Sequence, residues 1–216
     1  MAALKNLYLV GAGGFGRELL NQIQTIHELY GARWNIQGFL DDTEDPLHGK
    51  ACDYGVVGTI RGYTPAPDDV LLMCITDPQA KREIVPFLKS KGAVFDSFAS
   101  PLVSWGRHNQ IGEGAIISAH FGMSVNVRVG DFATLLSCEL AHDVTVGDYC
   151  TILGHATLLG NVSVGDGVFI GDSAKIASNV QVGDNAYVCM GSVVLKNVPA
   201  GVKVLGNPSR EIGLQT

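Results

Sequence analysis

The chain has 216 residues, of which 46% are hydrophobic, and a formal net charge of −6. This length allows two modest domains. The negative charge argues against a nucleic-acid-binding surface, and because the sequence lacks a run of about 18 apolar residues, no membrane span is expected.

The N-terminus and the cysteines both indicate a cytoplasmic protein. Leu7–Val10 is too short for the apolar region of a signal peptide. The five cysteines are odd in number and form no C-x-x-C pair. We therefore expect them to be small buried apolar residues in a reducing compartment, with a catalytic thiol as a minor alternative.

Strands and helices alternate in the first hundred residues, which predicts a small parallel α/β sheet. The expected strands are Leu7–Val10, Ile36–Leu40, Val70–Ile75 and Ala93–Phe95. A helix is expected over 17–23, and a second one begins after Asp77, because Pro78 suits a first helical turn. The segment 98–109, with Pro101 and Gly106, is the expected connection to a second domain.

A glycine fingerprint, Gly11-x-Gly13-x-x-Gly16, lies between the first strand and the first helix. Its glycines let a phosphate approach the backbone, and a helix N-terminus favours an anion. Asp41 and Asp42 end the next strand, where a ribose or base contact would lie. A nucleotide or nucleotide-sugar site is favoured over NAD(P), because the segment is too short for a two-lobed dinucleotide domain. A tight turn without a ligand is the third interpretation.

A hexapeptide repeat dominates the second half of the chain. Aliphatic residues recur at every sixth position from Val146 to Val194, and the phrase Val-x-Val-Gly-Asp recurs at 127–131, 144–148, 162–166 and 180–184. An earlier series, from Ile111 to Leu135, joins the first through Leu140 if one residue is missing. A period of six fits neither an amphipathic helix nor a lone strand and predicts a parallel β-helix with three units in each coil.

The two halves together resemble the bacterial sugar acyltransferases of the NeuD/PglD type. The motifs that carry the resemblance are Gly11–Glu18 (GAGGFGRE), Gly38–Asp42 (GFLDD), Ala141–Asp148 (AHDVTVGD), Leu159–Val162 (LGNV) and Val198–Pro208 (VPAGVKVLGNP). The resemblance implies a Rossmann-like nucleotide-sugar-binding domain over 1–98. It also implies a left-handed β-helix acyltransferase domain with a C-terminal tail over 99–216, and a homotrimer.

The family moves an acetyl group from acetyl-CoA to an amine or hydroxyl of a sugar, in surface glycan or polysaccharide biosynthesis. The resemblance assigns His142 as the general base, with Asp143 to orient it and the Gly160 amide to face the thioester carbonyl. His142 also lies beside the break in the six-residue register. An amine needs only one base, so we expect N-acetylation of a nucleotide-linked amino sugar, with sialic-acid-type O-acetylation as the alternative.

The resemblance also assigns the two binding sites, without a metal. The nucleotide would contact Gly13, Gly14, Gly16, Asp41 and Asp42. Acetyl-CoA would contact Thr151, Gly160, Gly171, Asp172, Gly191, Lys196, Gly206 and Pro208, with Lys196 and Arg210 available for its phosphates.

Four residues depart from the family pattern: Phe15, Leu135, Thr151 and Ser209. Leu135 and Thr151 replace an Asn and a His that are found in relatives, which leaves the identity of the sugar open.

Two other classes of protein use a β-helix. A gamma-class carbonic anhydrase would need three zinc-bound histidines from among His108, His120, His142 and His155. The repeat places His120 and His155 on one side of the prism and His142 on another, so one subunit does not bring three together. A non-catalytic binding β-helix would need neither His142-Asp143 nor the glycine fingerprint.

Overall fold

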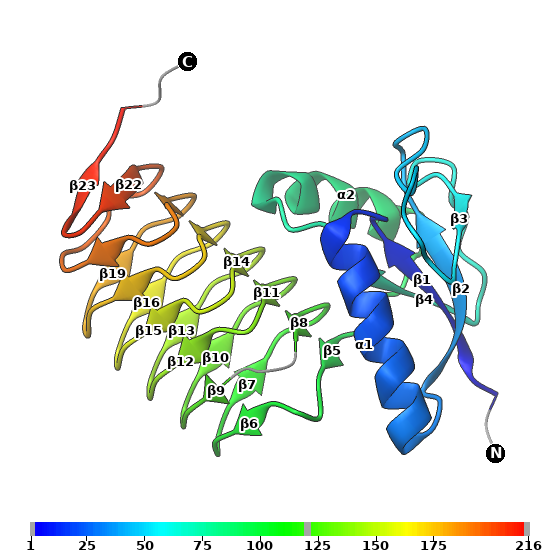
Figure 1. The fold of residues 1–216 in the computed structure, drawn as a ribbon, viewed down its shortest axis with the longest axis horizontal. Coiled ribbons are helices and arrows are strands. Elements are labelled where there is room, and N and C mark those ends of the chain that lie inside the picture. Colours follow the sequence, from blue (N-terminus) through cyan, green and yellow to red (C-terminus); the bar gives the residue numbers. More distant parts are fainter. Residues whose placement is uncertain (1–2, 119–121, 214–216) are drawn as a thin grey trace. The chain divides into compact units, whose positions relative to one another are not determined.

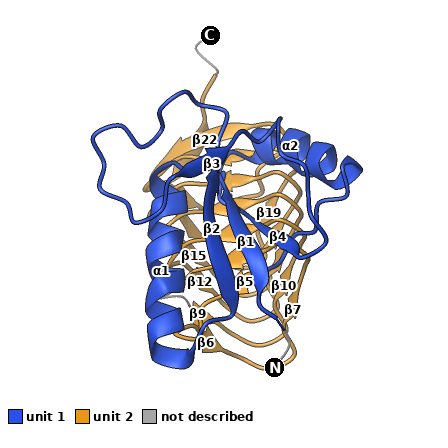
Figure 2. Ribbon diagram, turned by 90° about the vertical axis from the view of Figure 1, so that its right-hand side faces the viewer, with its two compact units in different colours: residues 1–97 blue, residues 98–216 orange. Residues whose placement is uncertain are grey.

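The chain divides into two units, Met1–Ser97 and Phe98–Thr216, which Figure 2 draws in blue and orange. The computed structural model describes residues 3–118 and 122–213. None of the helices in these two ranges is both long and apolar enough to cross a membrane.

Unit 1 is a parallel sheet with helical crossovers. Among the described residues its sheet has four strands, in the order β3-β2-β1-β4. The strands are β1 (Lys5–Val10), β2 (Trp34–Leu40), β3 (Val56–Gly58) and β4 (Asp69–Met73), and the helices are α1 (Gly14–Tyr30) and α2 (Pro78–Ser90). The side chain of Asp77 caps α2 by accepting a hydrogen bond from the Ala80 N–H, at 2.7 Å.

Two predictions about unit 1 were wrong. Strand β3 was not expected, and its short run exposes Val56 and Val57, which hides the usual burial signal. The expected strand Ala93–Phe95 forms only one isolated bridge, between Phe95 and Leu71. The next residue, Asp96, still donates its N–H to the Leu71 carbonyl at 2.9 Å, while its carboxylate accepts hydrogen bonds from Arg33 and from the indole of Trp34.

Unit 2 is a β-solenoid whose strands from β5 to β21 are parallel and two residues long, and Figure 1 shows its coils stacked along one axis. Within the described residues it has three sheets, of eight, six and five strands. The eight-stranded sheet contains β5 (Phe98–Ala99), β8 (Ile116–Ile117), β11 (Thr134–Leu135), β14 (Thr151–Ile152), β17 (Phe169–Ile170), β20 (Tyr187–Val188), β22 (Lys203–Gly206) and β23 (Ser209–Glu211). The six-stranded sheet contains β6 (Ser104–Trp105), β9 (Gly122–Met123), β12 (Glu139–Leu140), β15 (Thr157–Leu158), β18 (Lys175–Ile176) and β21 (Val193–Val194). The five-stranded sheet contains β7 (Gln110–Ile111), β10 (Arg128–Val129), β13 (Thr145–Val146), β16 (Ser163–Val164) and β19 (Gln181–Val182).

The sixth-residue positions form the core of the solenoid, as predicted. Ile152 and Ile170 are completely buried and pair with each other across neighbouring coils. The missing residue lies between β11 and β12, where three residues join the strands, whereas four join β12 to β13. The segment 98–109 is not merely a connection, because β5 and β6 already pair with β8 and β9.

The Val-Gly-Asp phrase is explained by an aspartate ladder. Each aspartate carboxylate accepts a hydrogen bond from a backbone N–H one coil earlier. The bonds join Glu113 N to Asp131, Asp131 N to Asp148, Asp148 N to Asp166 and Asp166 N to Asp184, at 2.8, 2.8, 2.8 and 2.9 Å. A side chain at the preceding glycine would overlap the ladder; at Gly130, for example, a Cβ would collide with the Asp148 carboxylate.

Two of the cysteines are buried deeply enough to be chemically quiet. Burial raises the pKa of the Cys74 thiol and of the Cys138 thiol well above the ordinary value. Both remain protonated near neutral pH, so neither fits the role of a thiolate nucleophile.

Replacing Ile170 with alanine is expected to destabilise the protein by about 2–5 kcal/mol, because it leaves a cavity in a fully buried layer. Gln181→Ala is the control, since Gln181 is exposed on the five-stranded sheet and should change stability by less than about 0.5 kcal/mol. Thermal unfolding followed by circular dichroism compares the two variants. Equal melting temperatures would contradict the assignment of Ile170 to the core.

Candidate active site

His142 and Asp143 lie at the corner that follows β12. Asp143 has a positive φ of 61°, a backbone conformation that turns the chain sharply there. The imidazole Nδ1 lies 2.8 Å from the Asp143 Oδ2, and the two side chains are 56% and 45% exposed. An ionised carboxylate can only accept, so Nδ1 carries the proton, and in the neutral form of the ring the lone pair lies on Nε2. His142 is therefore oriented as a base with Nε2 available.

Asn126, from the corner one coil earlier, holds the other oxygen of the same carboxylate. Its side-chain Nδ2 donates to the Asp143 Oδ1 at 3.1 Å. The hydrogen bond with His142, followed by this one from Asn126, lowers the pKa of the Asp143 carboxyl below its ordinary value. Asp143 therefore stays ionised at neutral pH. Asn126 was not predicted from the sequence, because only its place one coil, or 17 residues, before Asp143 distinguishes it from other corner asparagines.

Gly160 lies directly against the imidazole. A Cβ on this residue would approach the His142 Nε2 to 2.5 Å, so only glycine leaves room for the ring. Gly160 is buried, and the structure gives its amide no acceptor among residues 3–118 and 122–213. A spare backbone N–H beside a base is the arrangement that a developing oxyanion requires.

His142, Gly160 and Lys196 share one position in a stack of four coils, with Ser178 between Gly160 and Lys196, and we call this stack the His142 column. Leu140 pairs with Leu158, Leu158 with Ile176, and Ile176 with Val194. The three residues lie two positions after Leu140, Leu158 and Val194 respectively. The fold thus aligns three predicted site residues on one corner.

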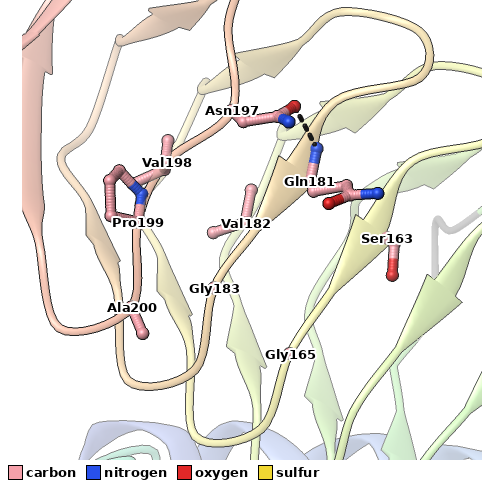
Figure 3. Close-up of a pocket in the computed structure, with 9 residues that line it drawn as sticks. All are labelled: Ser163, Gly165, Gln181, Val182, Gly183, Asn197, Val198, Pro199 and Ala200. Atoms are coloured by element: carbon pink, nitrogen blue, oxygen red, sulfur yellow. Dashed lines mark hydrogen bonds between the residues drawn. The ribbon is translucent and has the colours of Figure 1, made fainter.

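The tail carries a second group of predicted residues. Lys196, Pro208 and Arg210 line one cavity of about 480 Å³ beside the last coil. Gly206 is the last residue of β22, which pairs with β23 in an antiparallel hairpin. A neighbouring cavity of about 470 Å³ shares Asn197, Val198 and Pro199 with the first (Figure 3). There the Asn197 Oδ1 accepts a hydrogen bond from the Gln181 N–H at 2.9 Å.

The remaining predicted acetyl-CoA contacts are not gathered at the same corner. Gly171, Asp172 and Gly191 lie at the corner that joins the eight-stranded sheet to the six-stranded sheet. Thr151 is completely buried in β14 and pairs with Thr134 and Phe169.

The glycine loop precedes α1 as the fingerprint predicts. Gly13 is the N-cap and has no side chain to cap the helix. A Cβ on Gly13 or Gly14 would meet no atom within 4 Å, whereas a Cβ on Gly16 would collide with the Gly11 carbonyl. Gly13 and Gly14 therefore leave open space at the helix N-terminus, and Gly16 allows close packing.

The two aspartates after β2 have partners within unit 1. Asp41 Oδ2 accepts from the Ala12 N–H at 2.7 Å, so this carboxylate shapes the glycine loop itself. Asp42 Oδ1 accepts from the Arg61 N–H at 3.1 Å, and its other oxygen lies 3.7 Å from the Arg61 Nε. The other oxygen of Asp41, Oδ1, accepts from the Thr43 N–H at 2.8 Å. Asp41 is half-buried, whereas Asp42 is exposed.

The three described histidines of the carbonic-anhydrase alternative lie at two corners, and His108 shares with His142 the corner that joins the six-stranded sheet to the five-stranded sheet. His155 lies at the corner between β14 and β15, and His142 lies between β12 and β13. His108 lines a cavity with Asn126 and Asp143, whereas His120 lies outside the described residues. In the part of the chain that the structure describes, no three His, Cys, Asp or Glu side chains gather to hold a metal ion.

Two family models match the chain. The PglD N-terminal domain matches residues 6–87, and the bacterial transferase hexapeptide repeat matches residues 161–196. Together they cover parts of both units.

One curated relative and two solved structures span almost the whole chain. GDP-perosamine N-acetyltransferase of Escherichia coli is 33% identical over 96% of this chain and 96% of its own. WeeI from Acinetobacter baumannii is 28% identical, covers 95% of this chain and 99% of its own, and superposes with a TM-score of 0.82. PerB from Caulobacter crescentus, solved with CoA and GDP-perosamine, is 22% identical over 98% of this chain and all of its own, with a TM-score of 0.83. At that identity PerB supports the fold alone.

Proposed function

This chain belongs to the NeuD/PglD-type hexapeptide-repeat acetyltransferases, and we propose that it N-acetylates a GDP-linked amino sugar with acetyl-CoA as donor. The choice of a GDP-linked amino sugar rests on the relative from Escherichia coli, a GDP-perosamine N-acetyltransferase that is 33% identical along nearly the full length. The single structural observation that supports acetyl transfer is the imidazole of His142, held by Asp143 and bordered by the buried residue Gly160.

The proposed reaction is direct attack of the sugar amine on the thioester. His142 Nε2 takes a proton from the amine as its nitrogen bonds to the carbonyl carbon. The carbonyl oxygen gains negative charge and accepts a hydrogen bond from the Gly160 N–H. When the intermediate collapses, the carbon–sulfur bond breaks, and the departing thiolate takes the proton from the imidazolium. Asp143 remains ionised and steadies the positive ring between the two transfers.

In this proposal the nucleotide diphosphate binds at the N-terminus of α1. Backbone N–H groups at a helix start are suited to an anion, and no side chain crowds Gly13 or Gly14. Asp42, which is exposed beside Arg61, is available for the nucleoside. The unit would then be a Rossmann-like nucleotide-sugar domain, to which the match with the PglD N-terminal domain lends support.

Acetyl-CoA would run along the solenoid from the His142 column to the tail. Lys196 and Arg210 line the same tail cavity and offer cations to its phosphates. Gly171, Asp172 and Gly191 remain proposed contacts at the other corner. Thr151 is the least favoured of the set, because its side chain is buried within β14.

We further propose a left-handed solenoid and a homotrimer that works in the cytoplasm. Family membership supports the handedness. Leu159 and Leu195, beside the His142 column, are 46% and 58% exposed, as residues that a second subunit covers would be in a single chain. None of the five cysteines, all of which lie in the described ranges, forms a disulfide, which fits a reducing compartment.

Replacing Gly13 with aspartate is expected to raise the KM for the nucleotide sugar about tenfold or more, since its charge would repel the diphosphate at the helix N-terminus. The fold should tolerate the change, because aspartate is a favourable N-cap and the space is open. Gly13→Asn is the matched neutral control. Steady-state kinetics should show the KM for acetyl-CoA unchanged in both variants. An equal rise in KM with asparagine would point to bulk rather than charge.

The proposal is tested by CoA release, measured with DTNB, across GDP-, UDP- and dTDP-linked amino sugars. Turnover on a GDP-linked amino sugar is expected, with mass spectrometry showing acetyl on its nitrogen. Turnover only on a hydroxyl acceptor such as sialic acid would move the function to O-acetylation. If folded protein releases no CoA with any acceptor, the acetyltransferase proposal is wrong.

A further inference from the structure

We propose that Asn126 is a positioning residue for acetyl transfer, acting through Asp143 on the His142 base. This inference rests on the proposed function. Asn126 Nδ2 donates to one oxygen of Asp143 at 3.1 Å, and the His142 Nδ1 binds the other oxygen at 2.8 Å. Three side chains from two coils therefore form a continuous chain of hydrogen bonds that ends at the His142 ring, whose other nitrogen, Nε2, is the proposed base.

Packing alone cannot fix the Asp143 carboxylate. Its side chain is 45% exposed and borders a cavity of about 390 Å³. Besides Asn126 and Asp143, the cavity lining includes His108, Gln110, Arg128 and Thr145. A carboxylate at such an open corner would rotate among several positions unless a hydrogen bond selected one of them. His142, the ring to be positioned, bonds one oxygen, and Asn126 supplies the second bond, to the other oxygen.

The backbone of Asn126 is itself well held. Its φ is 59°, and its N–H donates to the Arg107 carbonyl at 3.1 Å. Asparagine tolerates this left-handed conformation better than most residues do, and its amide can reach across to the next coil. The amide therefore starts from a fixed point, which is what a positioning residue needs.

The chemistry also favours a neutral donor at this place. A cation in contact with Asp143 would neutralise the carboxylate and weaken the attraction between Asp143 and the imidazolium that forms during the reaction. An amide orients the carboxylate and leaves its negative charge available to His142. Arg128 and His108 are the other titratable groups lining the same cavity, and His142 is the titratable group hydrogen-bonded to Asp143.

The test is Asn126→Gly, which removes the amide and keeps a residue that accepts a positive φ. We expect kcat to fall about tenfold, as for loss of a hydrogen bond to a charged group, with both KM values within about twofold. Asn179→Gly is the matched control, because Asn179 has a φ of 63° at the same corner but lies two coils beyond Asp143. It should keep wild-type kinetics.

Asn126→Asp places a second carboxylate against the first and should lose more activity than Asn126→Gly. In an Asp143→Ala background, Asn126→Gly should have no further effect on kcat, because the residue acts only through Asp143. Wild-type kcat in Asn126→Gly would overturn the proposal, and so would a full additional loss in the Asp143→Ala background. In either case an active wild-type enzyme would leave the acetyltransferase function standing.

Discussion

Replacing His142 with asparagine is expected to lower kcat by about 10²–10⁴-fold, the usual worth of a positioned general base. Close to the backbone the asparagine side chain occupies a space similar to that of histidine, but its amide cannot take a proton from the sugar amine. The ring is more than half exposed, so its loss should leave the fold intact. Single-turnover acetyl transfer at saturating acetyl-CoA measures the chemical step directly.

The matched control is His155→Asn. His155 is also an exposed corner histidine, and its φ of 57° is one that asparagine accepts. Its carbonyl, which accepts from the Lys175 ammonium at 2.9 Å, is unchanged by the substitution. Similar losses in the two variants would show that corner histidines stabilise the solenoid rather than catalyse. Full activity in His142→Asn would exclude this residue as the base.

Replacing Gly160 with alanine is expected to lower kcat by about 100-fold, because a displacement of about 1 Å at a reacting group can cost that much. The new methyl carbon would lie 2.5 Å from the His142 Nε2, the atom that must take the proton. The ring has open solvent on one side and can swing away, so stability should change little. The φ of Gly160 is outside the left-handed region, so the backbone accepts alanine.

Gly122→Ala serves as the control for this substitution. Its added methyl would have the Glu139 Cγ at 3.9 Å as its nearest neighbour, an ordinary contact on the same six-stranded sheet. Kinetics and melting temperature should both match the wild type. If Gly160→Ala lowered the melting temperature together with the activity, the loss of activity would reflect a folding defect rather than displacement of the imidazole.

The solenoid could be predicted closely from the sequence because its core repeats at a fixed period. Every residue from Ile152 to Val194 on that period is buried, and the missing residue before Leu140 is visible in the chain alone. The function of the Val-Gly-Asp phrase could not be predicted, since the carboxylate of Asp148 bonds to an amide that is 17 residues away in sequence. Only the stacking of coils brings the two together.

The candidate site shows the same division. Adjacent residues such as His142 and Asp143 form a recognisable pair, and Gly160 follows one full coil later. Asn126 carries no local signal, because asparagine is common at corners of this kind, as Asn161 and Asn179 show. In unit 1 the fingerprint predicted the loop correctly, but nothing in the sequence indicated that Asp41 binds the loop amide of Ala12.

The stacking of coils fixes the distance between residues that lie on different coils of the solenoid. Each coil between His142 and Lys196 advances the chain by one strand spacing, so the three coils span about 14 Å at roughly 4.8 Å each. An inserted coil could keep the core and the ladder intact and still move the basic tail away from the reacting base. If acetyl-CoA lies along the solenoid as proposed, its fixed length makes the number of coils a determinant of activity. Repeat proteins gain and lose whole units, and here such a change would preserve the fold but alter the activity.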